Sequence, residues 1–288
     1  MEQNKQLRKP EWLKKKISSD GHFFKNSLQR SGINTVCESA RCPNICQCFK
    51  ENTATFMILG DTCTRNCKFC NVKTGKPDFY NFEEEIKKIL NICSEYKYDY
   101  VTITSVTRDD LDDFGISSFV KLTEGLHKKN IMAELLIPDL NGNITLLQNI
   151  IEVQPEVLNH NIEMIQRLYS KIRPQSDFDR SLNLLKNIKK NTDNKKTIAK
   201  TGFMIGLGET TDEIKELIKT LASINIDVLT IGQYLRPSLA HFPVEKYRHP
   251  DEFSFFEEYA LSNGFKAVIA EPYARSSYKA KEMYFKAV

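Results

Sequence analysis

Alternating strand-like and helix-like segments constrain the fold of this chain more than any other feature of its sequence. Short apolar runs rich in β-branched residues have the pattern of buried strands, at residues 53–59, 100–105, 131–137, 156–161, 197–206, 228–234 and 265–270. Segments with the periodicity of amphipathic helices lie between them, at residues 82–96, 116–128, 144–153, 178–189, 212–223 and 252–263. Such alternation predicts a parallel sheet with right-handed crossovers.

A closed or partly closed barrel is favoured over a doubly wound sheet. The candidate reactive residues follow directly after strands, as they do where loops at the carboxyl ends of barrel strands build a site. No Gly-x-Gly-x-x-Gly motif follows the first strand, which weighs against a dinucleotide-binding fold. We therefore predict an α/β protein with a partial (β/α)6 TIM-type barrel at residues 53–270. Residues 1–52 form an N-terminal extension with a cysteine loop, and residues 271–288 form a C-terminal segment.

Composition limits the partners that this chain is expected to have. Its 288 residues are 41% hydrophobic, enough for one substantial core. A net charge of +4 is too small to predict nucleic-acid binding, and the basic N-terminal residues are read as a solvated tail. No apolar run approaches the roughly 20 residues of a membrane helix, and no secretory signal is present. We expect a cytoplasmic protein with no nucleic-acid or membrane partner.

Seven of the eight cysteines lie between Cys37 and Cys70, and six of them form two triplets. Three thiolates can hold three irons of a four-iron cluster and leave the fourth iron to another ligand. Zinc is the alternative, but zinc sites usually close with four ligands in paired Cys-x2-Cys knuckles, a spacing that neither triplet repeats. The sequence therefore predicts two iron–sulfur clusters, one on each triplet: Cys37-x4-Cys42-x5-Cys48 and Cys63-x3-Cys67-x2-Cys70.

The second triplet, in GDTCTRNCKFCNV, resembles the signature of the radical S-adenosylmethionine superfamily, with Phe69 as the aromatic residue before the last cysteine. The resemblance implies that Cys63, Cys67 and Cys70 hold a 4Fe-4S cluster whose open iron is chelated by S-adenosylmethionine. An electron from the reduced cluster would then cleave the sulfonium and release a 5′-deoxyadenosyl radical. Such a radical takes hydrogen from unactivated carbon.

The first triplet and the C-terminal segment are similar to the lipoyl synthase family. The first triplet begins CESARCPN, and the tail AEPYARSSYKA carries the family's Arg-Ser-Ser-Tyr motif. Further matching segments include RKPEWLK, TSVTRDDLDDFG, LNHNIEM, RLYSKIRP, GFMIGLGET and LTIGQYLRPS, so the resemblance covers nearly the whole chain. It implies that Ser277 completes an auxiliary 4Fe-4S cluster held by Cys37, Cys42 and Cys48. A serine oxygen is a harder donor than a thiolate, and so should be the most easily displaced ligand.

This resemblance implies an activity and a set of partners. The expected reaction inserts two sulfur atoms at C6 and C8 of a protein-bound octanoyl group, with S-adenosylmethionine and two 4Fe-4S clusters as cofactors. Expected partners are octanoylated lipoyl carrier domains or the glycine-cleavage H protein, an electron donor such as ferredoxin or flavodoxin, and an iron–sulfur cluster carrier. Alternatives are another sulfur-inserting radical enzyme, such as a methylthiotransferase, and a non-catalytic iron–sulfur carrier.

Other residues are candidates for binding the nucleoside. Asn161 and Arg173 could meet the methionine carboxylate or the ribose, since guanidinium pairs well with carboxylate; a structural role at a helix end is the alternative. Gly206, Gly208 and Glu209 end a strand and would let the backbone approach the nucleoside. The alternative there is a tight turn capped by Thr210 or Thr211.

Four further side chains are assigned no part in the chemistry. Cys46 stands where the family usually has glycine and adds a fourth thiol to the first loop, with no role that the sequence reveals. Cys93 is expected to be a small core residue on a helix, and His160 to be packed. The sequence identifies no partner for His241.

Overall fold

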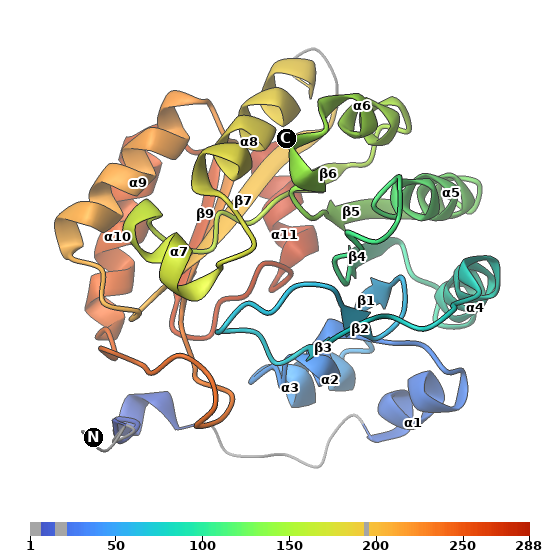
Figure 1. Ribbon diagram of the computed structural model, residues 1–288, viewed down its shortest axis with the longest axis horizontal. Coiled ribbons are helices and arrows are strands. Elements are labelled where there is room, and N and C mark those ends of the chain that lie inside the picture. Colours follow the sequence, from blue (N-terminus) through green and yellow to red (C-terminus); the bar gives the residue numbers. More distant parts are fainter. Residues whose placement is uncertain (1–6, 15–21, 193–195) are drawn as a thin grey trace.

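The computed structural model describes residues 7–14, 22–192 and 196–288. Its centre is a seven-stranded parallel sheet in the order β1-β4-β5-β6-β7-β8-β9, curved into a partial barrel (Figure 1). The strands are β1 (Thr55–Ile58), β4 (Tyr100–Ser105), β5 (Met132–Leu136), β6 (Val157–Asn159), β7 (Ile198–Ile205), β8 (Val228–Gln233) and β9 (Ala267–Glu271). A separate parallel pair, β2 (Thr62–Cys63) and β3 (Lys73–Thr74), borders the second cysteine loop.

Six helices cover the outside of the sheet, one after each of its first six strands (Figure 1). They are α4 (Phe82–Glu95), α5 (Ile116–His127), α6 (Ile144–Glu152), α8 (Phe178–Thr192), α9 (Thr211–Ser223) and α10 (Pro250–Ser262). Shorter helices lie in the loops: η2 (Leu140–Gly142), η3 (Gln166–Leu168) and α7 (Tyr169–Ile172). The predicted α/β partial barrel is confirmed, and each predicted strand and helix of the barrel is present within a few residues.

The two faces of the sheet differ in character because successive side chains of a strand point in opposite directions. Residues such as Ile103, Leu135 and Leu158 are fully buried in the main core, together with the outer helices. The inner face carries polar groups instead. There the Lys200 ammonium donates to a carboxylate oxygen of Glu134 at 2.8 Å, and the Tyr100 hydroxyl donates to the other oxygen at 2.7 Å. The pairing satisfies charges that would otherwise be costly to bury.

The N-terminal region is more ordered than its sequence indicated. It contains η1 (Glu11–Leu13), α1 (His22–Arg30), α2 (Val36–Ser39) and α3 (Ile45–Lys50). No helix is predicted in this extension from the sequence, yet α1 buries Phe24 and Leu28, and the Phe24 ring meets those of Phe49 and Tyr96 edge-on. A nine-residue helix with two buried apolar positions is too short to stand out in a sequence, and tertiary packing stabilises it.

The C-terminal segment lies inside the curve of the sheet. After β9, the carbonyl of Pro272 accepts a hydrogen bond from the backbone N–H of Gln233 at 3.2 Å. The segment then crosses β8 so closely that a Cβ on Gly232 would lie 2.2 Å from the Ala274 carbonyl oxygen. Helix α11 (Ala280–Ala287) then packs its Met283 and Ala287 against inner-face strand residues (Figure 1). The segment thereby packs on the inner face of the sheet near the starts of β6 to β9, and it reaches β1 through the hydrogen bond between Ser277 and Thr55.

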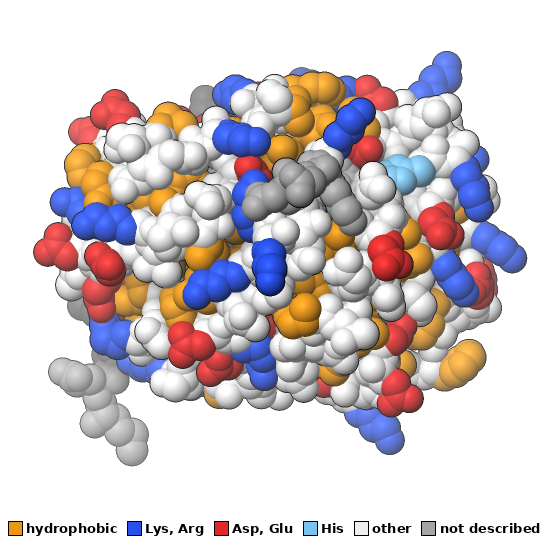
Figure 2. All heavy atoms as spheres, turned by 90° about the horizontal axis from the view of Figure 1, so that it is seen from above, with side chains coloured by type: hydrophobic (Ala, Val, Ile, Leu, Met, Phe, Trp, Pro, Cys, Tyr) orange, Lys and Arg blue, Asp and Glu red, His pale blue; other side chains and the backbone are white. Residues whose placement is uncertain are grey.

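The face of the molecule seen in Figure 2 does not concentrate charge of one sign. On the face seen in Figure 2, lysine and arginine side chains are interspersed with aspartate and glutamate. Within the described part of the chain, no helix is both long and apolar enough to cross a membrane. Cys93 is fully buried on α4 and His160 is 1% exposed, so both are packed as expected.

Candidate active site

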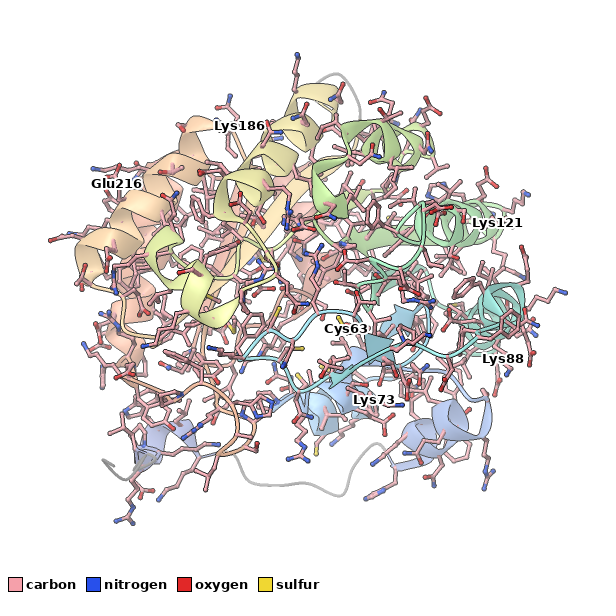
Figure 3. The ribbon with its side chains drawn as sticks, viewed as in Figure 1. Cys63, Lys73, Lys88, Lys121, Lys186 and Glu216 are labelled. Atoms are coloured by element: carbon pink, nitrogen blue, oxygen red, sulfur yellow. The ribbon has the colours of Figure 1, made fainter. Side chains whose placement is uncertain are left out.

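The loop carrying Cys63, Cys67 and Cys70 follows β1 at the carboxyl end of the barrel, and Figure 3 shows sulfur atoms gathered near Cys63. Arg65, inside this loop, anchors it. Its guanidinium makes two hydrogen bonds of 2.7 Å to Asp109 and an ion pair of 2.8 Å with the fully buried carboxylate of Asp139. Sequence reasoning missed these three residues. The available signal was that both aspartates come shortly after strands, so their carboxylates meet at one edge of the sheet.

Backbone contacts hold the rest of this loop. The Lys68 amide donates to the Ile172 carbonyl at 2.9 Å, and the Lys68 carbonyl accepts from the Phe242 amide at 2.8 Å. His241, for which no partner had been identified, lies with Nε2 3.0 Å from the Cys70 carbonyl. A carbonyl only accepts, so Nε2 carries a proton, and Nδ1 lies 2.8 Å from the Ser238 hydroxyl. Both ends of the loop are therefore fixed by residues distant in sequence.

The thiols of this loop are in a setting that disfavours the free thiolate. Burial raises the pKa of Cys70 to about 12, and it also raises the pKa of Cys67, which a hydrogen bond from Arg173 opposes. Iron binds the thiolate and so must displace the proton, which makes loading dependent on pH. The Cys63 sulfur also raises the pKa of Cys67 and of Cys70, as expected for thiols that lie close together.

The donors suit an iron–sulfur cluster in type and number. Among residues 7–14, 22–192 and 196–288, no three or more His, Cys, Asp or Glu side chains gather tightly enough to hold one metal ion. A four-iron cluster gives each thiolate its own iron, so its ligands need not converge on one point. Thiolates are the soft donors that such clusters prefer, and each loop supplies three of them.

A polar cradle lies beside this loop. Arg173 hydrogen-bonds Cys67 and the Tyr169 hydroxyl. Burial raises the pKa of Glu163, and attraction to the Arg173 guanidinium opposes part of that rise. Asn161 donates to Glu163 at 3.2 Å. Two buried atoms of the cradle, Oδ1 of Asn161 and Nε of Arg173, have no hydrogen-bond partner within the described residues. Unpartnered buried polar groups of both signs fit a polar ligand. Glu163 was not singled out from the sequence.

Gly206, Gly208 and Glu209 form a turn at the end of β7. The Glu209 carboxylate accepts from the amides of Gly206 at 2.7 Å and Leu207 at 2.8 Å, and Arg248 lies 3.4 Å away. Thr210 caps α9 in a capping box with Glu213. These contacts are those of the tight-turn alternative; contact of the turn with a nucleoside stays a prediction. Phe69 is partly buried against the main core.

The structure brings Ser277 to the first cysteine triplet, although the two are far apart in sequence. The Thr55 hydroxyl lies 2.6 Å from the Ser277 hydroxyl, and Thr55 also hydrogen-bonds Cys37. Other residues of the C-terminal segment also contact this region. Asn44 donates to the Tyr273 carbonyl at 2.8 Å. Arg275 interacts electrostatically with Cys42, and Tyr278 does so with Cys48. Burial raises the pKa of Cys37 to about 12. Cys46 is partly buried on α3.

One short contact joins the two cysteine regions. Asn161, in the cradle beside the second loop, donates from Nδ2 to the Ser276 hydroxyl at 2.6 Å. Ser276 precedes the serine that lies beside the first loop. The cradle beside the second loop and the C-terminal segment beside the first loop are therefore in direct contact.

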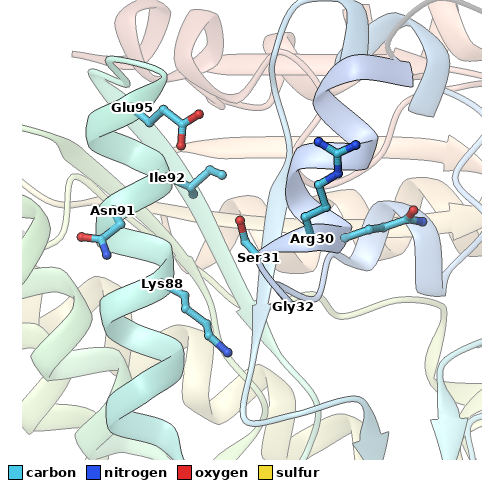
Figure 4. Close-up of a pocket in the computed structure, with 8 residues that line it drawn as sticks. Arg30, Ser31, Gly32, Lys88, Asn91, Ile92 and Glu95 are labelled. Carbon is cyan, nitrogen blue, oxygen red and sulfur yellow. The ribbon is translucent and has the colours of Figure 1, made fainter.

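Two surface grooves lie on other parts of the molecule. One, of about 380 Å³, is formed by the end of α1 and one side of α4, with Ser31, Lys88 and Glu95 in its wall (Figure 4). The other, of about 390 Å³, lies beside the β2–β3 pair and is lined by Gly60, Tyr80 and Arg108 among others. Neither is lined by a cysteine of either triplet.

Comparison with curated proteins shows strong similarity along the whole chain. The profile of the Radical SAM superfamily matches residues 57–221. A lipoyl synthase from Caldicellulosiruptor saccharolyticus is 46% identical over 281 residues, covering 96% of this chain and 98% of that protein. A lipoyl synthase from Desulfotalea psychrophila is 43% identical over 292 residues, covering 99% of this chain and 97% of that protein.

Solved structures support the fold. Methylornithine synthase superposes with a TM-score of 0.54 at 15% identity, over 74% of this chain and 69% of that one. The FeFe-hydrogenase maturase of Carboxydothermus hydrogenoformans gives 0.59 at 13% identity, over 80% and 55%. With the superfamily profile and near-complete matches to lipoyl synthases, the chain belongs to the lipoyl synthase family of the radical SAM superfamily, whose members require a 4Fe-4S cluster and S-adenosylmethionine.

Proposed function

We propose that this lipoyl synthase works with two separate 4Fe-4S clusters. Cys63, Cys67 and Cys70 hold the cluster that binds S-adenosylmethionine. The auxiliary cluster is held by the first triplet and by Ser277, and the proposed ligand set is Cys37, Cys42, Cys48 and Ser277. The observation that carries this proposal is the contact network around Thr55, which places a C-terminal hydroxyl beside the N-terminal thiols.

When bound, these groups supply a 5′-deoxyadenosyl radical and the sulfide that is inserted at C6 and C8 of the octanoyl group. The chain's own residues bind and orient. Arg173 would pair with the carboxylate of the methionine end, since a guanidinium matches carboxylate geometry. Burial raises the pKa of the Glu163 carboxyl group, and the amino group of S-adenosylmethionine would give its carboxylate a positively charged partner. Asn161, bonded to both Glu163 and Ser276, fixes the cradle relative to the C-terminal segment.

No general base is assigned, because a saturated acyl chain has no acidic proton to remove. Arg65, inside the second loop, is already paired with Asp109 and Asp139. These pairs are suited to holding a loop still, and positioning is what a radical enzyme needs from its protein. A reactive intermediate must meet one carbon and no other.

The finer identity of the partners belongs to the same proposal. The acyl substrate is carried on a lysine of an octanoylated lipoyl domain or of the glycine-cleavage H protein. Ferredoxin or flavodoxin supplies electrons, and an iron–sulfur carrier rebuilds the auxiliary cluster. The enzyme acts in the cytoplasm, where its thiols stay reduced.

The test uses anaerobically loaded protein whose cluster sulfide is isotopically labelled, with an octanoylated carrier domain as substrate. We expect one 5′-deoxyadenosine for each carbon–hydrogen bond broken, and labelled sulfur in the lipoyl product, both by mass spectrometry. A carrier domain without the octanoyl group is the control. Product sulfur that comes from unlabelled sulfide in solution, or zinc in place of iron in the purified protein, would contradict the proposal.

A further inference from the structure

Thr55 lies where the first cysteine triplet, strand β1 and the C-terminal segment meet. It is the first residue of β1 and is 3% exposed. Its hydroxyl is 2.6 Å from the Ser277 hydroxyl, across 222 residues of sequence. The same residue hydrogen-bonds Cys37 through both its backbone amide and its side chain. One threonine therefore contacts two of the four groups in the proposed auxiliary ligand set.

The direction of the Thr55–Ser277 hydrogen bond follows from what the serine would do as a ligand. A serine oxygen bound to iron has given up its proton, so it can only accept. Thr55 must then be the donor. Its hydroxyl has one proton, and a short contact to a charged oxygen is the stronger use of it. The backbone amide of Thr55 remains available to the Cys37 sulfur.

The hydrogen bond with Thr55 gives the Ser277 side chain a fixed orientation. A serine side chain has three staggered rotamers of similar energy, and Ser277 is partly exposed in a segment that enters the barrel from β9. Thr55, in contrast, belongs to a strand paired with β4, and its β-branched side chain is stiff. A rigid donor on one edge strand can thus select one rotamer of a serine that arrives from the other edge.

We propose that Thr55 is a positioning residue, which holds Ser277 in the rotamer that reaches the fourth iron of the auxiliary cluster. The inference rests on the proposed function, because it needs Ser277 to be a ligand. Partners of a ligand's second atom orient that ligand and tune its bond to the metal. Loss of the Thr55 hydroxyl leaves the three thiolates in place and frees the serine to rotate away. The fourth iron then becomes open to small molecules.

The test isolates the auxiliary cluster. In a chain with Cys63→Ala, Cys67→Ala and Cys70→Ala, only that cluster is loaded, and its irons are observed by Mössbauer spectroscopy and by iron and sulfide analysis. Thr55→Val removes the hydroxyl at nearly constant shape, Thr55→Ser keeps the hydroxyl, and Ser277→Ala removes the ligand. Thr55→Ala repeats the test without added bulk should valine not fit the site. Circular dichroism verifies folding.

We expect Thr55→Val to keep its iron and to shift the spectrum of one iron toward that of Ser277→Ala. A small thiol should bind this iron about 10-fold more tightly than it binds wild type, the lower end of typical effects of outer ligand partners. Thr55→Ser should match wild type. Adding Thr55→Val to Ser277→Ala should not tighten thiol binding further, because the two residues act on this iron through one bond.

Two results would overturn the inference while leaving the proposed function intact. In one, Thr55→Val keeps the wild-type spectrum although Ser277→Ala changes it. In the other, Thr55→Ser behaves like Thr55→Val, which would assign the effect to packing of the methyl group. A Ser277→Ala protein with the wild-type spectrum would instead contradict the proposed ligand set, and the role of Thr55 with it.

Discussion

The two cysteine loops of this protein are built in different ways. The second loop is held by charges and backbone bonds from several elements: Arg65 to two aspartates, Lys68 to Ile172 and Phe242, and the Cys70 carbonyl to His241. The first loop is mostly two short helices, α2 and α3, whose backbone bonds are internal. Its ties to the barrel include Asn44 with Tyr273, and Asn71 with the Ser39 carbonyl at 2.8 Å.

This difference matches the work proposed for each loop. A cluster that must deliver an electron to one sulfonium, and then allow one carbon to be attacked, needs a fixed frame. A cluster that is taken apart and rebuilt needs a site that opens at lower cost than global unfolding. Buried ion pairs would keep the second loop fixed. Two short helices, with the Ser277 hydroxyl as the proposed fourth ligand, would let the first loop open more easily.

The sharpest way to break the comparison is to remove one ligand from each loop. Cys63→Ala should reduce 5′-deoxyadenosine formation to background, because the cluster that binds S-adenosylmethionine is lost. Cys37→Ala should still cleave S-adenosylmethionine and form 5′-deoxyadenosine, but it should give no lipoyl product. Both products are measured by liquid chromatography with mass spectrometry. If Cys37→Ala also abolished 5′-deoxyadenosine formation, the two loops would not be functionally separate.

The anchoring of the second loop predicts the next largest effect. Arg65→Met leaves the buried Asp139 with Arg180 alone and leaves Asp109 without its paired guanidinium, so the free energy of unfolding should fall by about 3 kcal/mol. Lys73→Met is the matched control, because its ion pair with Asp61 is 3.7 Å long and exposed. That change should cost less than about 0.5 kcal/mol. Denaturant titration compares the two, and equal losses would show that Arg65 is not an anchor.

Two glycines at the end of β7 test whether the frame around the second loop is tightly packed. Gly206 has φ +101°, and a Cβ there would lie 2.1 Å from Gln233 Nε2, which is tied to the carbonyls of Tyr234 and Lys246. Gly208 has φ +107°, but its nearest neighbour would be 3.4 Å away. Gly208→Ala should therefore cost about 1–2 kcal/mol for backbone strain alone.

Gly206→Ala carries the same backbone strain and an added steric clash. It should be the more destabilising of the pair by roughly 1–3 kcal/mol, the usual cost of overpacking. Urea midpoints of the two variants give the difference directly. Equal midpoints would mean that Gln233 can move aside, and that the turn is looser than its contacts indicate.

Acid should weaken the second loop in particular. Although burial opposes ionisation, hydrogen bonds and attraction from Arg65 and Arg180 hold the pKa of Asp139 below its ordinary value of 3.8. A carboxylate with a lowered pKa stabilises the fold above its unfolded pKa, and that contribution is lost as pH falls through the folded pKa. The free energy of unfolding should therefore decline below about pH 4. Denaturant titrations between pH 3 and 7 measure the slope.

Asp139→Asn should reduce that acid-dependent slope, although the variant is less stable overall at neutral pH. Asp61→Asn, at a largely exposed carboxylate, is the control and should leave the slope almost unchanged. An unaltered slope in Asp139→Asn would assign the acid sensitivity to other carboxylates.

The barrel was predictable because its signals are local. The run at residues 100–105 coincides with β4, and the helices between strands appear where the periodicity placed them. Helix α1 was not predicted because two buried apolar residues in nine make a weak pattern. Likewise, the Arg65 anchor escaped because an arginine in a loop does not reveal which distant carboxylate it will meet.

By itself, the sequence determined the alternation of strands and helices, the two sets of three thiols and the family to which the chain belongs. Those features depend on residue type and spacing, which a linear chain displays directly. Only the tertiary structure decided that Thr55 meets both Cys37 and Ser277, that Asn161 meets Ser276, and that Asp109 and Asp139 share Arg65. Such contacts depend on how a curved sheet brings its edges and strand ends together, and no local pattern encodes that geometry.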